Sequence, residues 1–252
     1  MHYFAGYGVI QKTGVRGQGT EAHAISIASK PKALRLSLLF MPNHNSEESH
    51  EKPAPAAYPI HEHIARRWSP RAYTGQPVDR YQLAQLFEAA RWAPSSSNEQ
   101  PWAFLIAERG TAGWQKLFDT LVPFNQGWVK SAPLLVLGLA RKTFAANNNP
   151  NKFALYDLGQ AVGGLLEQAT ALGLSVHQMA GFDAEKARTA FGIPENYEVG
   201  SMMTIGFAAD PDSLSGQLRE REVAPRTRNP IESFVFEEEI GRPAEFRAAD
   251  GR

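Results

Sequence analysis

The stretch from Ala132 to Ala140 constrains the fold most, because it is an almost unbroken apolar run. A strand with one solvated face alternates apolar and polar residues, so this run predicts a strand covered by helices on both faces. Its length is far below the roughly 20 residues that a membrane-spanning helix needs. We therefore expect a central sheet flanked by helices, and no membrane partner.

A long amphipathic helix is predicted after the loop Asn147–Asn151. Its apolar positions recur at helical spacing: Leu158, Ala161, Val162, Leu165, Leu166, Ala169 and Leu172. Gly163 and Gly164 lie in its middle, where each glycine costs about 1 kcal/mol of helix propensity relative to alanine. Close approach of another backbone is the usual compensation, so we expect tight packing there.

Shorter patterns give the remaining elements. Asp79 and Asp183 are suited to cap the helices that follow them. The pattern predicts a short helix over 61–67, a helix after Asp79, a buried strand over 103–107, a helix over 114–121, and strands over 174–179 and 199–208.

Composition excludes several functions. The 252 residues carry 26 Lys plus Arg, 26 Asp plus Glu and no cysteine. Zero net charge gives no electrostatic footprint for nucleic acid, and the absence of cysteine excludes disulfides, thiol catalysis and cysteine-ligated metals. We expect no metal site, and a redox function would need an organic cofactor.

The chain divides into three parts by composition. Residues 1–57 are rich in glycine and then polar, and we expect a disordered leader with Met41 as a candidate alternative start. Residues 58–240 form the predicted domain, and 241–252 a flexible tail.

Two polar features stand out within the domain. The loop Trp92–Trp102 places three serines, an asparagine and a glutamine between two prolines, which suits a binding loop as well as a solvated connection. Arginines cluster at 66–71 and again at 226–228, and a guanidinium suits phosphate, although each cluster alone also fits a solvated surface. Together they suggest a phosphorylated planar cofactor. We interpret His177 as structural rather than catalytic.

These segments resemble the nitroreductase family of FMN-dependent flavoproteins. The resemblance rests on Arg67–Arg71, Ala93–Trp102, Tyr156–Ala161, His177–Asp183 and Pro225–Arg228, in that order. It implies an α+β fold, an interlocked homodimer, a cytoplasmic location and one FMN in each of two interface sites.

The resemblance also implies site residues, with no catalytic side chain. Those expected to bind FMN are Arg67, Trp68, Ser69, Arg71, Ser95, Ser96, Ser97, Asn98, Gln100, Ala180, Gly181, Arg226 and Arg228. The serines lie in a loop that comes from the partner subunit in the family, and Ala180 acts through its backbone.

The implied activity is ping-pong transfer of hydride from NAD(P)H, through FMN, to a small electron-poor acceptor such as a nitroaromatic or quinone. A lid over 118–128, with Phe124 and Trp128, is expected to choose the acceptor. A specialised relative, such as a dehalogenase, a flavin-fragmenting enzyme or a dehydrogenase, and a non-catalytic flavin-binding protein are the alternatives.

Overall fold

The computed structural model describes residues 51–246. Its strands are β1 (Trp102–Glu108), β2 (Leu134–Arg141), β3 (Ser175–Met179) and β4 (Tyr197–Gly206). Its α-helices are α1 (Glu62–Arg66), α2 (Arg80–Arg91), α3 (Ala112–Phe118), α4 (Pro123–Val129), α5 (Ala154–Ala171), α6 (Ala184–Phe191) and α7 (Gly216–Val223). Short 3-10 turns cover Ser96–Asn98, Pro211–Ser213 and Ile231–Ser233.

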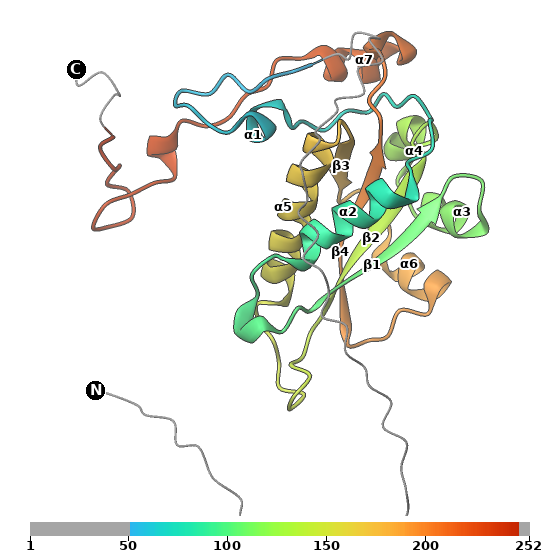
Figure 1. Ribbon diagram of the computed structural model, residues 1–252, viewed down its shortest axis with the longest axis horizontal. Helices are drawn as coiled ribbons and strands as arrows, with labels where there is room; N and C mark the ends of the chain where they lie inside the picture. The colour runs from blue at the N-terminus through green and yellow to red at the C-terminus, as the bar shows by residue number, and fades with distance from the viewer. Residues whose placement is uncertain (1–50, 247–252) are drawn as a thin grey trace, which may run out of the picture. The chain divides into compact units, whose positions relative to one another are not determined.

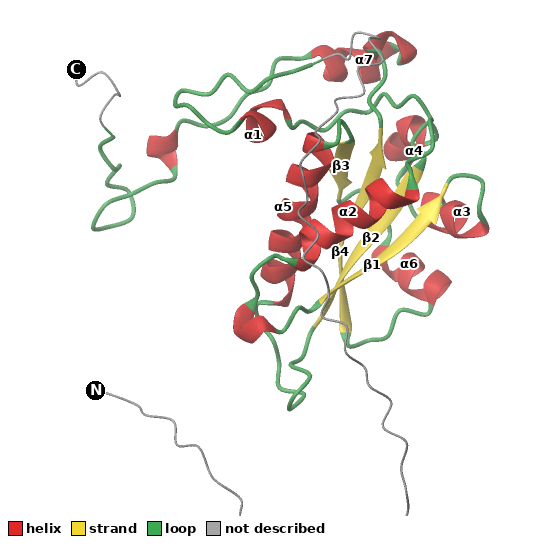
Figure 2. Ribbon diagram, in the orientation of Figure 1, coloured by secondary structure: helices red, strands yellow, loops and turns green. Residues whose placement is uncertain are grey.

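The four strands form one antiparallel sheet in the order β1-β2-β4-β3. Helices α2 and α5 pack on one face, and α3, α4 and α6 pack on the other (Figures 1 and 2). The expected α+β architecture, a central sheet flanked by helices, is confirmed.

Strand β2 supplies both hydrophobic cores. Leu134 and Val136 point toward α2 and α5, whereas Leu135, Leu137 and Leu139 belong to the core on the opposite face. Successive side chains of a strand point to opposite faces, so an all-apolar strand fills two cores at once. The prediction for this strand is confirmed.

Strand β1 differs from its prediction as a buried strand. Among the strands of residues 51–246, it lies at the edge of the sheet and pairs only with β2. Most of its residues are partly exposed, and Ile106 is 42% exposed. An apolar sequence favours a strand but does not determine whether a second strand covers its other edge.

The two glycines inside α5 have different surroundings. A Cβ at Gly164 would lie 3.0 Å from the carbonyl oxygen of Ala89 in α2, so the expected close backbone approach is confirmed there. A Cβ at Gly163 would meet no atom within 4 Å. Of these two glycines, only Gly164 is therefore needed for packing among the described residues.

Both predicted aspartate caps are present. The side chain of Asp79 accepts from the amides of Tyr81 and Gln82, and Asp183 accepts from the amide of Lys186. These bonds satisfy helix N-terminal amides that have no partner within the helix.

The ends of the described chain are held by hydrogen bonds. The amide of Ala54 donates to the carbonyl of Ala65 (2.8 Å), and Ala244 donates to Val235 (3.0 Å). Residues 51–57 were assigned to the leader and 241–246 to the tail. The rest of both segments, Met41 included, lies outside the described residues.

No helix within 51–246 is long and apolar enough to cross a membrane. The same residues contain no group of three or more potential His, Asp or Glu ligands that could hold a metal ion.

Candidate cofactor site

Three of the predicted guanidinium groups converge at one end of the domain. Arg67 donates to the hydroxyl of Ser69 (3.3 Å). Burial and the neighbouring charge of Arg228 lower the pKa of Arg67, with Glu167 opposing the shift. Burial and the charges of Arg67 and Arg228 lower the pKa of Arg226. Such mutual repulsion in partly buried groups is what an anionic ligand would relieve.

A pocket of about 160 Å³ opens beside this cluster, where α5 ends and β3 begins. Its lining includes Arg67 and Trp68 together with Thr170, Val176 and Phe207. The pocket therefore combines guanidinium groups with an apolar wall, as a phosphorylated ring compound requires.

Arg71 is held beside this cluster with one donor unused. Its Nε is buried and has no hydrogen-bond partner among the described residues. Its amide donates to the carboxylate of Glu222, at 2.8 and 3.0 Å from the two oxygens. A buried donor without a partner is costly, so Arg71 fits a site whose ligand supplies an acceptor.

His177 has a structural environment, in agreement with its interpretation. Its Nδ1–H donates to the carbonyl of Pro70 (2.9 Å), and its ring lies 4.6 Å from that of Trp128, tilted by 32°. Burial lowers the pKa of His177 to about 4, against the opposing bond to Pro70. The neutral ring ties β3 to the segment that carries Arg71.

The turn Ala180–Gly181 follows β3 directly. The carbonyl of Gly181 accepts from the amide of Val122 (3.1 Å) and from Nδ2 of Asn125 (3.0 Å). A Cβ at Gly181 would lie 2.6 Å from that same Nδ2. A larger residue at this position would therefore have to displace the Asn125 side chain from its hydrogen bond to this carbonyl.

The predicted binding loop has an unusual backbone. Ser97, Asn98 and Gln100 have positive φ values of 53°, 54° and 50°. Non-glycine residues in this region cost about 1 kcal/mol or more each, and they cluster at ligand-binding sites. Ser97 and Asn98 are exposed, and neither side chain has a hydrogen-bond partner within residues 51–246.

Local anchors hold this conformation. The amide of Gln100 donates to Oγ of Ser95 (3.0 Å), and the amide of Ser96 donates to the buried carboxylate of Asp157 (3.1 Å). Glu99 pairs with Arg141 and accepts from the amide of Ala145 (2.8 Å). The loop therefore presents Ser97 and Asn98 outward from a fixed frame.

Within one chain, the predicted site residues form two separate groups. Asp157, at the start of α5, holds the loop, whereas Thr170, near the other end, lines the pocket with Arg67. At 1.5 Å per residue, these two positions are about 20 Å apart along the helix. We call these places the loop end and the arginine end of α5. The turn Ala180–Gly181 follows the strand whose His177 bonds to Pro70, so it belongs with the arginine end.

Comparison with known proteins identifies the chain. Residues 64–207 match the model of the nitroreductase family. The chain belongs to the nitroreductase family.

Relatives agree with this assignment. An uncharacterized 15.4 kDa protein of Mycolicibacterium smegmatis is 33% identical over 56% of this chain and 98% of its own length. A Thermus thermophilus protein named NADH dehydrogenase is 27% identical, over 68% of this chain and 92% of its own length.

A solved structure described as an oxidoreductase containing FMN is 33% identical, with a TM-score of 0.70 over 74% of this chain and 96% of its own. The predicted family, fold and class of enzyme are confirmed.

Sequence reasoning missed two residues at the arginine end of this chain. Glu222 is fully buried and Lys52 bonds to its segment, yet both lie outside the matched residues 64–207. Neither stands in a periodic pattern, so only the tertiary contacts reveal them. Trp128, expected in the lid, is 1% exposed and belongs to the hydrophobic core, whereas Phe124 is 39% exposed.

Proposed function

We propose that this member of the nitroreductase family binds FMN, takes hydride from NAD(P)H and reduces small electron-poor acceptors such as nitroaromatics or quinones. The observation that carries the proposal is the arginine end itself. Mutually repelling guanidinium groups lie there beside a pocket with an apolar wall, and those of Arg67 and Arg226 are partly buried. FMN offers the phosphate and the planar ring that these groups fit.

The proposal assigns each group a role. Arg67, Arg226 and Arg228 bind the phosphate, while Trp68, Ser69 and Arg71 bind the ribityl chain and the polar edge of the ring. Bound FMN would supply the hydride-accepting chemistry. The unused Nε donor of Arg71 and its positive charge would stabilise negative charge on the reduced ring. The turn Ala180–Gly181 contributes backbone groups only.

The loop end would serve the site of a second copy of the chain. This end carries the predicted site residues Ser95, Ser96, Ser97, Asn98 and Gln100. It lies about 20 Å along α5 from the arginine end, too far to share one ligand within a single chain. A homodimer with two-fold symmetry would bring each loop to the partner's arginine end.

The exposed face of α5 supports this assembly. Glycines 159 and 163 have open space where a Cβ would stand, and Leu155 and Tyr156 are 49% and 66% exposed. A helix with small residues and uncovered apolar side chains suits close packing against another helix. The proposal includes a cytoplasmic location, where NAD(P)H is available.

The proposal also includes a ping-pong order, in which the oxidised nicotinamide leaves before the acceptor enters the same space. No side chain of the arginine end is required as a general acid or base. Steady-state rates at several fixed acceptor concentrations should therefore give parallel double-reciprocal lines.

Absorbance, FMN titration and sedimentation of the purified protein test the proposal first. We expect a flavin spectrum, saturable binding of added FMN and a dimer. Stopped-flow mixing with NADH and NADPH should bleach that spectrum, and a panel of nitroaromatics, quinones and enals should restore it. Colourless protein that refuses FMN would overturn the proposal, while bound FMN that neither nucleotide reduces would indicate a non-catalytic flavin-binding protein.

A further inference from the structure

Glu222 is an unusual residue on the helix that carries it. Helix α7 is strongly charged, and its Glu220 is exposed, but the side chain of Glu222 is completely buried. A buried carboxylate is costly unless hydrogen bonds and opposite charge compensate it. Its contacts should therefore show which groups compensate the buried charge.

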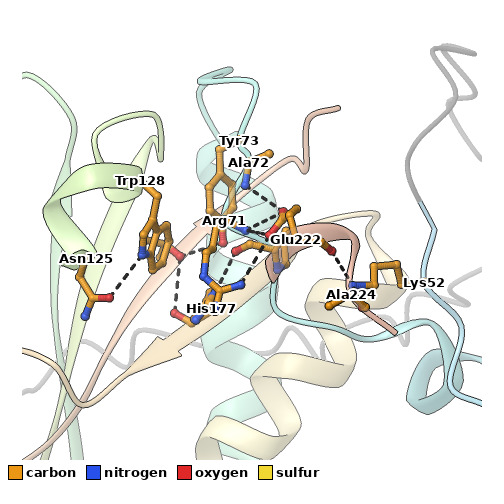
Figure 3. Close-up of polar contacts among 11 residues, drawn as sticks. Lys52, Arg71, Ala72, Tyr73, Asn125, Trp128, His177, Glu222 and Ala224 are labelled. Atoms are coloured by element: carbon orange, nitrogen blue, oxygen red, sulfur yellow. Dashed lines mark hydrogen bonds and ion pairs between the residues drawn. The ribbon is translucent and has the colours of Figure 1, made fainter. Parts of the chain in front are cut away.

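The hydrogen bonds to the carboxylate come from the segment that carries Arg71, and Lys52 adds a nearby positive charge. The amides of Arg71 and Ala72 donate to the Glu222 carboxylate, at 2.8 and 3.1 Å from Oε1. Nη1 of Arg71 lies 3.7 Å from Oε2, close enough for an ion pair. Figure 3 shows the carboxylate between this backbone and the guanidinium. Glu222 thus fixes the backbone of Arg71 and balances part of its charge.

The main chain of Glu222 is tied down in turn. Nζ of Lys52 donates to the carbonyls of Glu222 (2.5 Å) and Ala224 (2.6 Å), as Figure 3 also shows. Arg226, two residues further on, donates to the carbonyl of Lys52 (2.6 Å). Lys52 therefore links the segment of Glu222 to one of the proposed phosphate-binding arginines.

We propose that Glu222 is a positioning residue that holds Arg71 in the cofactor site and sets the net positive charge that Arg71 presents there. This inference rests on the proposed function. Its mechanism is electrostatic as well as steric: the carboxylate partly neutralises a guanidinium whose charge favours the reduced cofactor. Removal of the carboxylate charge should loosen the segment and strengthen that preference for the reduced form.

The test uses Glu222→Gln in the full-length, FMN-loaded protein. The amide keeps the size and one acceptor oxygen, but it removes the charge. We expect the Kd for oxidised FMN to rise about tenfold because one backbone anchor is lost. We also expect the reduction potential of bound FMN, measured by equilibrium titration against a reference dye, to become more positive.

If the inference is correct, the shift in reduction potential caused by Glu222→Gln must depend on Arg71. In an Arg71→Met background, Glu222→Gln should shift the potential clearly less, since the part of the shift that acts through the position of Arg71 is lost and only the direct field of the carboxylate remains. An equal shift in both backgrounds, no shift in either, or a shift to more negative potential in the native background would overturn the inference. A purely structural role predicts no such dependence on Arg71.

Two further variants complete the design. Glu220→Gln, on the exposed side of the same helix, should match the wild type in Kd and potential. If Glu222→Gln does not fold, Glu222→Asp keeps the charge but shortens its reach, and should raise the Kd for FMN while the potential stays near that of the wild type. A wild-type Kd in Glu222→Asp would overturn the positioning role. Failure of the wild type to bind FMN would instead refute the proposed function.

Discussion

The arginine end and the loop end of α5 are built by different means. At the arginine end, contacts join residues far apart in sequence, such as Arg71 with Glu222 and Lys52 with Arg226. At the loop end, a few neighbouring residues adopt positive φ angles and hold one another, with Asp157 as the main outside anchor. A binding surface can thus come from long-range assembly or from local backbone geometry, and each should respond differently to mutation.

The largest effect is expected from Arg67→Met. This change removes a partly buried guanidinium from the arginine end but keeps its apolar stem. Loss of a charged contact to phosphate should raise the Kd for FMN about 100-fold, roughly 2.7 kcal/mol. Fluorescence titration of the deflavinated protein measures it.

The control for that change is Arg91→Met. Arg91 pairs with the exposed Glu88 on α2, away from the pocket, and should leave the Kd for FMN near that of the wild type. Equal effects of the two changes would mean that net charge, rather than the arginine end, determines binding.

Mixed dimers test whether the two ends meet across subunits. Arg67→Met damages one end and Asn98→Ala the other, and each variant alone should be nearly inactive. Random mixing makes half of the dimers hybrid, and each hybrid contains one intact site, so activity should return to about one quarter of the wild-type value.

The absence of recovery, in mixtures shown by mass spectrometry to contain hybrid dimers, would contradict a shared site. It would mean that both residues act on the same ligand within one chain, or that only one of the two ends binds it.

The third prediction concerns pH. His177 has a pKa of about 4 in the folded protein and 6.5 as an unperturbed side chain. The unfolded chain therefore takes up a proton first as pH falls, and stability should decrease between about pH 6.5 and 4 by up to about 3 kcal/mol. Because His177 anchors the arginine end, FMN release should follow the same trend.

Denaturant unfolding of FMN-saturated protein across this pH range measures how steeply the free energy of unfolding falls with pH. His177→Gln should be less stable than the wild type at neutral pH but should lose less stability on acidification. His61→Asn, at the exposed cap of α1, should keep the wild-type slope. A His177→Gln slope equal to that of the wild type would assign the acid sensitivity to other groups.

The difference between the two ends also explains what the sequence could predict. Strand β2, helix α5 and the aspartate caps depend on periodicity or on neighbouring residues, and these predictions are confirmed. The edge position of β1 depends on which strands pair, and that information is not contained in the strand itself.

The same reasoning applies to the site. The loop end was visible as a polar run between prolines, whereas the burial of Glu222 depends on a segment about 150 residues away. Helix α7 has a weak apolar pattern that does not distinguish Glu222 from Glu220. Long-range assembly at the arginine end was therefore only partly predictable, through its arginines.

The smallest effects are expected at Gly163 and Gly164, midway between the two ends of α5. Alanine at these positions distinguishes packing within a chain from packing between chains. Gly163→Ala faces open space and Gly164→Ala faces the Ala89 carbonyl at 3.0 Å. Both gain about 1 kcal/mol of helix propensity, but only Gly164→Ala must displace a backbone oxygen of α2. Gly164→Ala should therefore have the lower free energy of unfolding.

Gly163→Ala should instead weaken the dimer severalfold in sedimentation equilibrium, because its new methyl group lies on the face proposed for the second copy. Unchanged dimer affinity in Gly163→Ala would mean that this part of α5 does not form the subunit contact. The proposed way in which the loop of one chain reaches the arginines of its partner would then be wrong.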